Sequence, residues 1–111
     1  MRQTTAFLIL LAAALLEAGG DALVRSGIRA SASGVRLLFW LAGALVLFSY
    51  GSVVNGTPWD FGRLIGIYVV FFFLVAQVIA WVAFNEKPDR LVVIGGCFVI
   101  AGGLIMSAGS R

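Results

Sequence analysis

Histidine, cysteine and charged residues are absent or scarce in this chain, and each scarcity excludes a kind of site or a class of protein. The sequence has no histidine, which removes the commonest general base and metal ligand. Its single cysteine, Cys97, lies in an apolar run, so we expect no disulfide and no metal-binding cysteine cluster within one chain. Charged residues make up only 12% of the 111 residues, whereas a soluble domain carries about 25%. A soluble globular domain is therefore excluded.

The remaining charges are scattered along the chain. Eight lysines and arginines against five acidic residues give a net charge of +3, but no basic block stands out. Nucleic acid is therefore not expected as a partner, and the basic residues are better suited to lipid headgroups. The sequence also lacks a nucleophile–base pair and a phosphate-cradling loop, so we predict no enzyme and no metal or organic cofactor.

Apolar residues are abundant and fall into four long runs. They make up 61% of the chain, and the mean hydropathy is +1.06. A spanning helix needs roughly 20 apolar residues, and in lipid every backbone polar group must be paired within the segment. We therefore predict an all-α integral membrane protein with one domain, residues 1–111, and four transmembrane helices at about 4–25, 35–54, 63–84 and 90–108. The first run is expected to be a retained helix rather than a signal peptide, because Glu17 and Asp21 stand where a small neutral cleavage motif belongs.

The loops between these helices are short, so neighbouring helices should be antiparallel. Lysine and arginine counts in such loops set the orientation of the chain. Three arginines lie on the side of the N-terminus, namely Arg2, Arg63 and Arg111; five cations lie on the other side, namely Arg25, Arg29, Arg36, Lys87 and Arg90. This difference slightly favours an N-terminus outside the cell. It is equally what a protein that inserts in both orientations would show.

Glu17 is the most informative residue. It comes about twelve residues into the first helix, roughly 18 Å along a hydrocarbon core about 30 Å thick. An ionised carboxylate at that depth costs several kcal/mol, so such a residue marks a functional site by default. Ala13, Gly20 and Asp21 share its helical face, and the two small residues allow a helix or ligand to approach closely. A carboxylate that holds either a proton or a cation is the minimum machinery for proton-coupled transport; the alternative is a protonated, hydrogen-bonded packing residue.

Three further polar residues accompany Glu17. Asp21 lies one turn beyond it, and the favoured interpretation is a surface salt bridge to Arg25; the alternative is a second carboxylate on the substrate path. Tyr68, in the third helix, could hydrogen-bond a carboxylate, stack on an organic cation or anchor the helix at the interface. Gln77 is uncharged and, if buried, would bind another helix.

The fourth helix is dense in small residues. Its members are Gly95, Gly96, Ala101, Gly102 and Gly103, with the glycine pairs repeating at a spacing of seven. Small residues on one stripe permit close helix–helix approach and predict an oligomer seam; packing within one chain is the alternative. Because four helices alone barely enclose a cavity, we expect at least a dimer.

Several short motifs resemble the small multidrug resistance family, within the drug/metabolite transporter superfamily. Residues 11–20, LAAALLEAGG, are closest to the YnfA-like branch, which carries an A-x-x-E-I-G-G segment in its first helix. Gly62-Arg63 ahead of Tyr68, and the KPDR segment at 87–90 ahead of Gly95, are similar to the same branch. The resemblance spans essentially the whole chain.

The resemblance implies specific roles. Glu17 matches the proton- and cation-binding glutamate that each subunit of an antiparallel dimer contributes. Tyr68 falls where an aromatic residue lines the binding chamber, and Gly95, Ala101 and Gly102 match the dimer seam. The implied mechanism is alternating access, in which protons displace a substrate loaded from inside. Asp21 is not a usual feature of the family.

We therefore predict a proton-coupled exporter of small organic cations in the bacterial inner membrane, working as a dual-topology homodimer. Its partners would be the bilayer, a cationic substrate and a second copy or a paralogue. Two alternatives remain open: a flippase-like carrier of lipid-linked metabolites, since the basic first loop suits anionic headgroups, and a non-transporting accessory subunit.

Overall fold

The described part of the chain, residues 2–108 of a computed structural model, is built from four α-helices. These are α1 (Gln3–Arg29), α2 (Ser33–Val54), α3 (Phe61–Phe84) and α4 (Arg90–Ala108). Each is long and apolar enough to cross a bilayer. The predicted all-α architecture with four spanning helices is confirmed.

Helix α1 ends at Arg29 rather than near residue 25, which leaves a shorter first loop than predicted. The extra turn contains Gly27, where an added Cβ would lie 2.6 Å from Cδ1 of Trp40. Because Gly27 has no side chain, Trp40 of α2 packs directly over this turn. A tertiary contact thus extends the helix, which the local sequence did not reveal.

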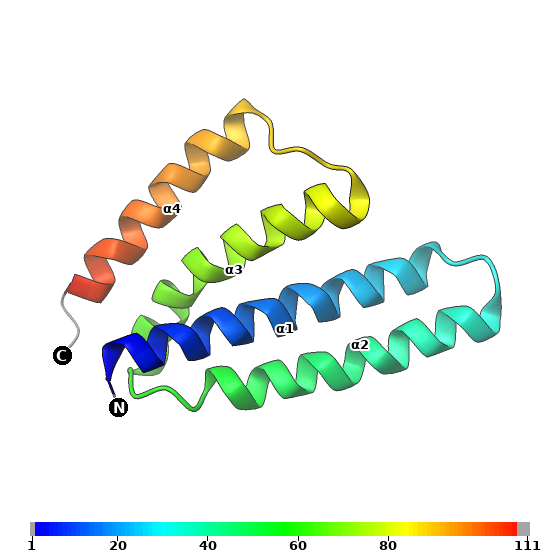
Figure 1. Cartoon of the computed structure of the whole chain (residues 1–111), viewed down its shortest axis with the longest axis horizontal. Coiled ribbons are helices and arrows are strands. Elements are labelled where there is room, and N and C mark those ends of the chain that lie inside the picture. The colour runs from blue at the N-terminus through cyan, green and yellow to red at the C-terminus, as the bar shows by residue number, and fades with distance from the viewer. Residues whose placement is uncertain (1, 109–111) are drawn as a thin grey trace.

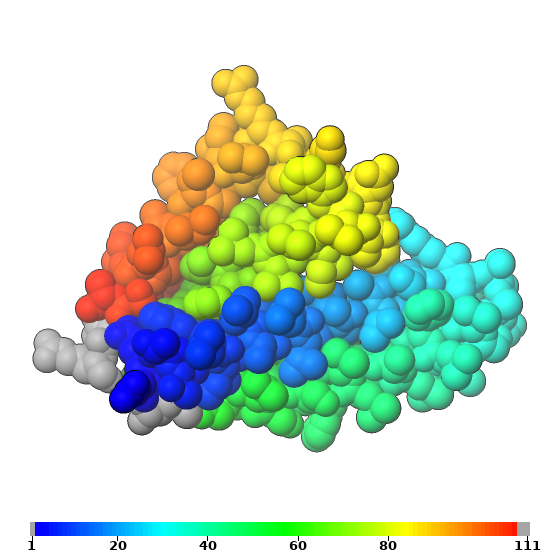
Figure 2. Space-filling model, viewed as in Figure 1, coloured from blue at the N-terminus to red at the C-terminus, as the bar shows by residue number. Residues whose placement is uncertain are grey.

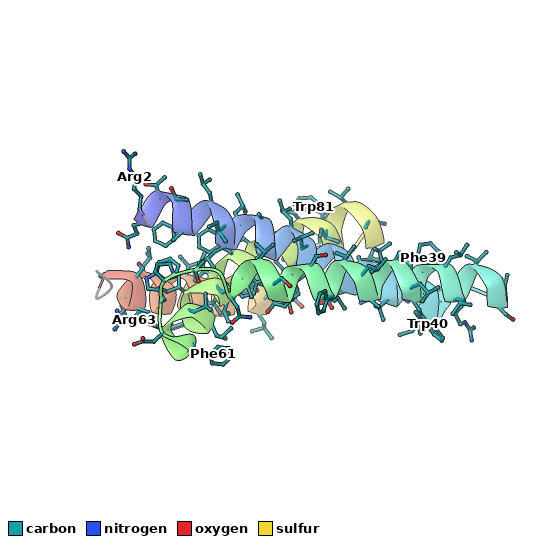
Figure 3. The ribbon with its side chains drawn as sticks, turned by 90° about the horizontal axis from the view of Figure 1, so that it is seen from below. Arg2, Phe39, Trp40, Phe61, Arg63 and Trp81 are labelled. Atoms are coloured by element: carbon teal, nitrogen blue, oxygen red, sulfur yellow. The ribbon has the colours of Figure 1, made fainter. Side chains whose placement is uncertain are left out.

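The helices follow one another in space in the order α2, α1, α3, α4 (Figure 1). Close backbone contacts join α1 to α2, α1 to α3, and α3 to α4. The molecule is flat, with extents of 49 × 34 × 19 Å. Helix α4 lies along α3 and away from α2 (Figure 2). Figure 3 shows Arg2 and Arg63 toward one end of the long axis and Trp40 toward the other.

The part of the core that α1 contributes consists mainly of alanines. Ala6, Ala13 and Ala14 are fully buried, as is Leu10. A glycine contact brings α1 and α2 together, because a Cβ at Gly43 would lie only 3.2 Å from the carbonyl oxygen of Gly20. Small residues at these positions let the backbones approach closely.

The outer surface is apolar, as a lipid-facing surface must be. Phe48, Val82 and Phe98 each expose at least three-quarters of their surface (78%, 82% and 75%). In the described residues no polar or charged residue is fully buried, although Glu17 is half-buried. An apolar outer surface together with a core free of fully buried polar residues in the described part fits a protein surrounded by lipid, because lipid tails are as apolar as the residues that pack between the helices.

Candidate functional site

The candidate site is centred on a hydrogen bond between Glu17 and Tyr68. Glu17 lies near the midpoint of α1, and the Tyr68 hydroxyl of α3 donates to its Oε1 at 2.8 Å. Tyr68 is 3% exposed, whereas Glu17 is half-buried. The tyrosine therefore orients one carboxylate oxygen, while the glutamate keeps part of its surface available to a proton or a ligand.

Aromatic rings surround this pair. The Tyr50 ring of α2 stacks on Tyr68 with 5.6 Å between ring centroids, and the Phe72 ring is tilted against Tyr68 with 6.1 Å between centroids. Tyr50 was not predicted as a site residue. Its only signal in the sequence is a hydroxyl within an apolar run, and its contact with α3 depends on tertiary packing.

A cavity of about 250 Å³ lies between α1 and α3, beyond Glu17 toward the α3–α4 loop. Asp21 and Gln77 line it, and both are predicted site residues. Phe72 lines it too, and so connects the cavity to the Tyr68 ring. Alanines make up much of the remaining wall, which leaves room for a compact ligand: Ala18, Ala22, Ala76 and Ala80.

Two other predicted site residues lie elsewhere. Gly20 faces α2, where an added Cβ would come within 2.8 Å of Leu47. Ala13 is fully buried in the core cluster. In one subunit these residues set helix spacing, and their role in substrate binding stays a prediction.

The predicted salt bridge between Asp21 and Arg25 is wrong. Arg25 Nη2 instead pairs with Oε2 of Glu86 at 2.8 Å. The spacing of four residues allows a local pair, but the α3–α4 loop brings Glu86 alongside α1. Asp21 makes no ion pair within residues 2–108 and remains exposed at the cavity.

The structure separates the two glycine pairs of α4. An added Cβ at Gly96 would lie 2.5 Å from the Phe73 ring, and one at Gly103 would collide with Val70, so this pair packs against α3. Gly95 and Gly102 have nothing within 4 Å of the same position. Ala101 is exposed. The outward pair is therefore available to a second helix.

Among residues 2–108, no group of three or more histidine, cysteine, aspartate or glutamate residues is placed to hold a metal ion. The chemistry that the site offers is that of a carboxylate in an aromatic, largely apolar surrounding. Such a group can bind either a proton or a cation, since both neutralise the same negative charge.

The chain is similar throughout its length to a set of bacterial membrane proteins. The family model described as "Uncharacterised BCR, YnfA/UPF0060 family" matches residues 3–111. A UPF0060 membrane protein of Mycolicibacterium vanbaalenii is 40% identical over 106 residues, covering 91% of this chain and 93% of the relative. A UPF0060 membrane protein of Streptomyces avermitilis is 39% identical, covering 85% of this chain and 82% of the relative. One of Clostridium perfringens is 32% identical, covering 91% of this chain and 90% of the relative. No solved structure matches the chain.

Proposed function

Because the chain belongs to the YnfA/UPF0060 family of membrane proteins, we propose that it exports small organic cations across the bacterial inner membrane in exchange for protons. The observation that carries this proposal is the hydrogen bond of 2.8 Å between Tyr68 and Glu17 near the middle of a spanning helix. An intramembrane carboxylate with a fixed hydroxyl donor is a site at which a proton and a cation compete.

In this proposal, the exchange of an organic cation for a proton depends on the charge of Glu17. With Glu17 ionised, an organic cation from the adjacent cavity neutralises the carboxylate, and the rings of Tyr68 and Tyr50 offer their faces to that cation. When a proton binds Glu17, the attraction is lost and the cation leaves. Coupling is therefore a property of the carboxylate, while Tyr68 keeps it oriented in both states.

The working unit in this proposal is an antiparallel homodimer, as the resemblance to the small multidrug resistance family implies. Two observations support it. One subunit is flat and places its cavity at a surface, and the outward glycines of α4 offer a seam for a second copy. In a dimer, each chain would contribute one Glu17.

The proposal is tested by solid-supported-membrane electrophysiology on proteoliposomes, with a panel of organic cations and an imposed pH gradient. Glu17→Gln keeps the shape of the side chain and removes its charge, so we expect cation-induced currents to disappear. Asp60→Asn makes the same change on an exposed loop carboxylate and should leave the currents intact.

Proton-coupled export that survives in Glu17→Gln would overturn the proposal. Wild-type proteoliposomes that carry no cation in the panel would also contradict it. In that case, co-purification of a stoichiometric larger partner would favour the accessory-subunit alternative, and movement of a lipid-linked substrate would favour the carrier alternative.

A further inference from the structure

At the end of the cavity near the α3–α4 loop, the side chain of Arg25 contacts both an aromatic ring and a carboxylate. The Arg25 guanidinium lies 4.8 Å from the centroid of the Phe84 ring and donates to Glu86 at 2.8 Å. A guanidinium over an aromatic face and against a carboxylate combines cation–π attraction with a charge-assisted hydrogen bond. Phe84 and Glu86 thus already form a cation-binding pair.

The ring and the carboxylate are held by the backbone, whereas the cation is not. Helix α3 ends in a left-handed Asn85 at φ 56°, and the Glu86 N–H donates to the Ala80 carbonyl at 2.9 Å. This turn folds Glu86 back against the end of the helix that carries Phe84. Arg25 reaches the pair on a long flexible side chain that is 41% exposed. The binding pair is therefore positioned by the backbone, whereas its occupant is a partly exposed side chain.

The pair opens into the cavity that leads toward Glu17. Arg25, Phe84 and Glu86 line it together with Asp21 and Gln77. Asp21 and Glu86 thus line the cavity with Arg25, whose ion pair to Glu86 leaves Asp21 uncompensated. The Arg29 guanidinium also lies over the Phe84 ring, 5.9 Å from its centroid, but is not part of the cavity lining. If Arg25 swings toward the exposed side, the cavity has two negative charges and an aromatic face.

We propose that Asp21, Phe84 and Glu86 form a second binding site for a compact organic cation, and that Arg25 is a tethered occupant which this cation displaces. The site deepens the proposed function and rests on it, because it lies between the loop and Glu17. A half-exposed ion pair contributes little net stability, so an incoming cation competes with Arg25 at low cost. A neutral solute has no charge with which to replace the guanidinium.

Binding at this site is measured with the inner carboxylate removed. In the Glu17→Gln background, isothermal titration with tetramethylammonium reports on the second site alone. We expect the added Arg25→Ala change to tighten binding at least tenfold, because the tethered competitor is gone. Phe84→Leu or Asp21→Asn, added to that variant, should remove most of the gain. Arg90→Ala takes away a cation at the nearby start of α4, outside the cavity lining, and should leave the affinity within twofold.

Equal affinity with and without Arg25, or an equal gain from Arg90→Ala, would overturn the second site. Arg25→Lys offers a check on folding, because it keeps the charge and the stem; it should bind tetramethylammonium more weakly than Arg25→Ala. These binding results do not depend on transport. Loss of transport in Glu17→Gln together with unchanged binding in Arg25→Ala would reject the second site alone, whereas transport that persists in Glu17→Gln would reject the proposed function.

Discussion

At the scale of single residues, the Tyr68 hydroxyl is the donor that fixes the direction of the Glu17 carboxylate. The bond joins residues on different helices, α1 and α3, and its donor ring is almost fully buried. A hydrogen bond to a charged group is worth about 1.5–3 kcal/mol. This bond therefore stabilises the orientation of the Glu17 carboxylate that the structure shows.

Tyr68→Phe removes the hydroxyl and keeps the ring. With a loss of about 1.5 kcal/mol, we expect the apparent affinity for a transported cation to fall roughly tenfold. The measurement is the concentration dependence of transport currents in proteoliposomes. Tyr50→Phe is the comparison variant: it removes a second hydroxyl that interacts with Glu17, but it keeps the ring stack and the 2.8 Å bond from Tyr68, so its effect should be smaller. Equal losses in the two variants would contradict this role for Tyr68.

The residues that the sequence predicts well are those whose signal is local. Glu17 stands out because a charge within an apolar run is costly wherever the neighbours lie. Tyr68 is conspicuous for its hydroxyl in such a run. The pairing of Arg25 with Glu86 could not be predicted, since the two are 61 positions apart and a nearer carboxylate, Asp21, satisfies the helical spacing. Tyr50 was missed because its contact depends on how α2 and α3 meet.

At the scale of the helix, α4 carries two glycine pairs with different surroundings. The spacing of seven is the same for both, so the sequence alone predicted a dimer seam for both pairs and kept packing within the chain as the alternative. The structure assigns Gly96 and Gly103 to α3 and leaves Gly95 and Gly102 open. Packing within the chain and the proposed dimer seam would then use different faces of α4.

Gly102→Leu and Gly103→Leu separate these two faces. At Gly102 the new side chain meets open space in the monomer, so we expect normal thermal stability and loss of self-association. At Gly103 it collides with Val70, and overpacking of this kind costs about 1–3 kcal/mol of stability. Subunit counting by single-molecule photobleaching in liposomes, together with thermal unfolding in detergent, distinguishes the outcomes. A Gly102→Leu protein that stays dimeric would exclude this face as the seam.

At the scale of the whole molecule, the number of helices was predictable and their arrangement was not. Length and hydropathy define a spanning helix without reference to its neighbours. The lateral order α2, α1, α3, α4 cannot be predicted from hydropathy, because lipid-facing and helix-facing positions are both apolar. Phe98 is exposed and Leu10 is buried, although both are large apolar residues within apolar runs of the sequence. For the same reason the cavity between α1 and α3 was not foreseen.

Orientation in the membrane is the property of the whole chain that the dimer requires. Five cations on the side of the first and third loops face three on the side of the termini, a bias small enough for insertion in both directions. A reporter at the C-terminus, read by protease protection on each side of the membrane, should therefore find two populations. Arg36→Gln with Arg90→Gln equalises the counts without changing the pair of Arg25 and Glu86 or the arginines over the Phe84 ring, and should raise the fraction with both termini inside.

The control adds two lysines to the first loop, which should lower that same fraction. An antiparallel dimer needs both orientations at comparable levels, so transport should fall in the lysine variant, which moves the population away from equality. It should be retained in the variant with equal counts, which moves the population toward equality. A wild-type chain found in one orientation only, and still fully active, would require a parallel dimer. In that arrangement the two Glu17 carboxylates would be related by an axis along the membrane normal, and the two loop-end cation sites would open on the same side of the membrane.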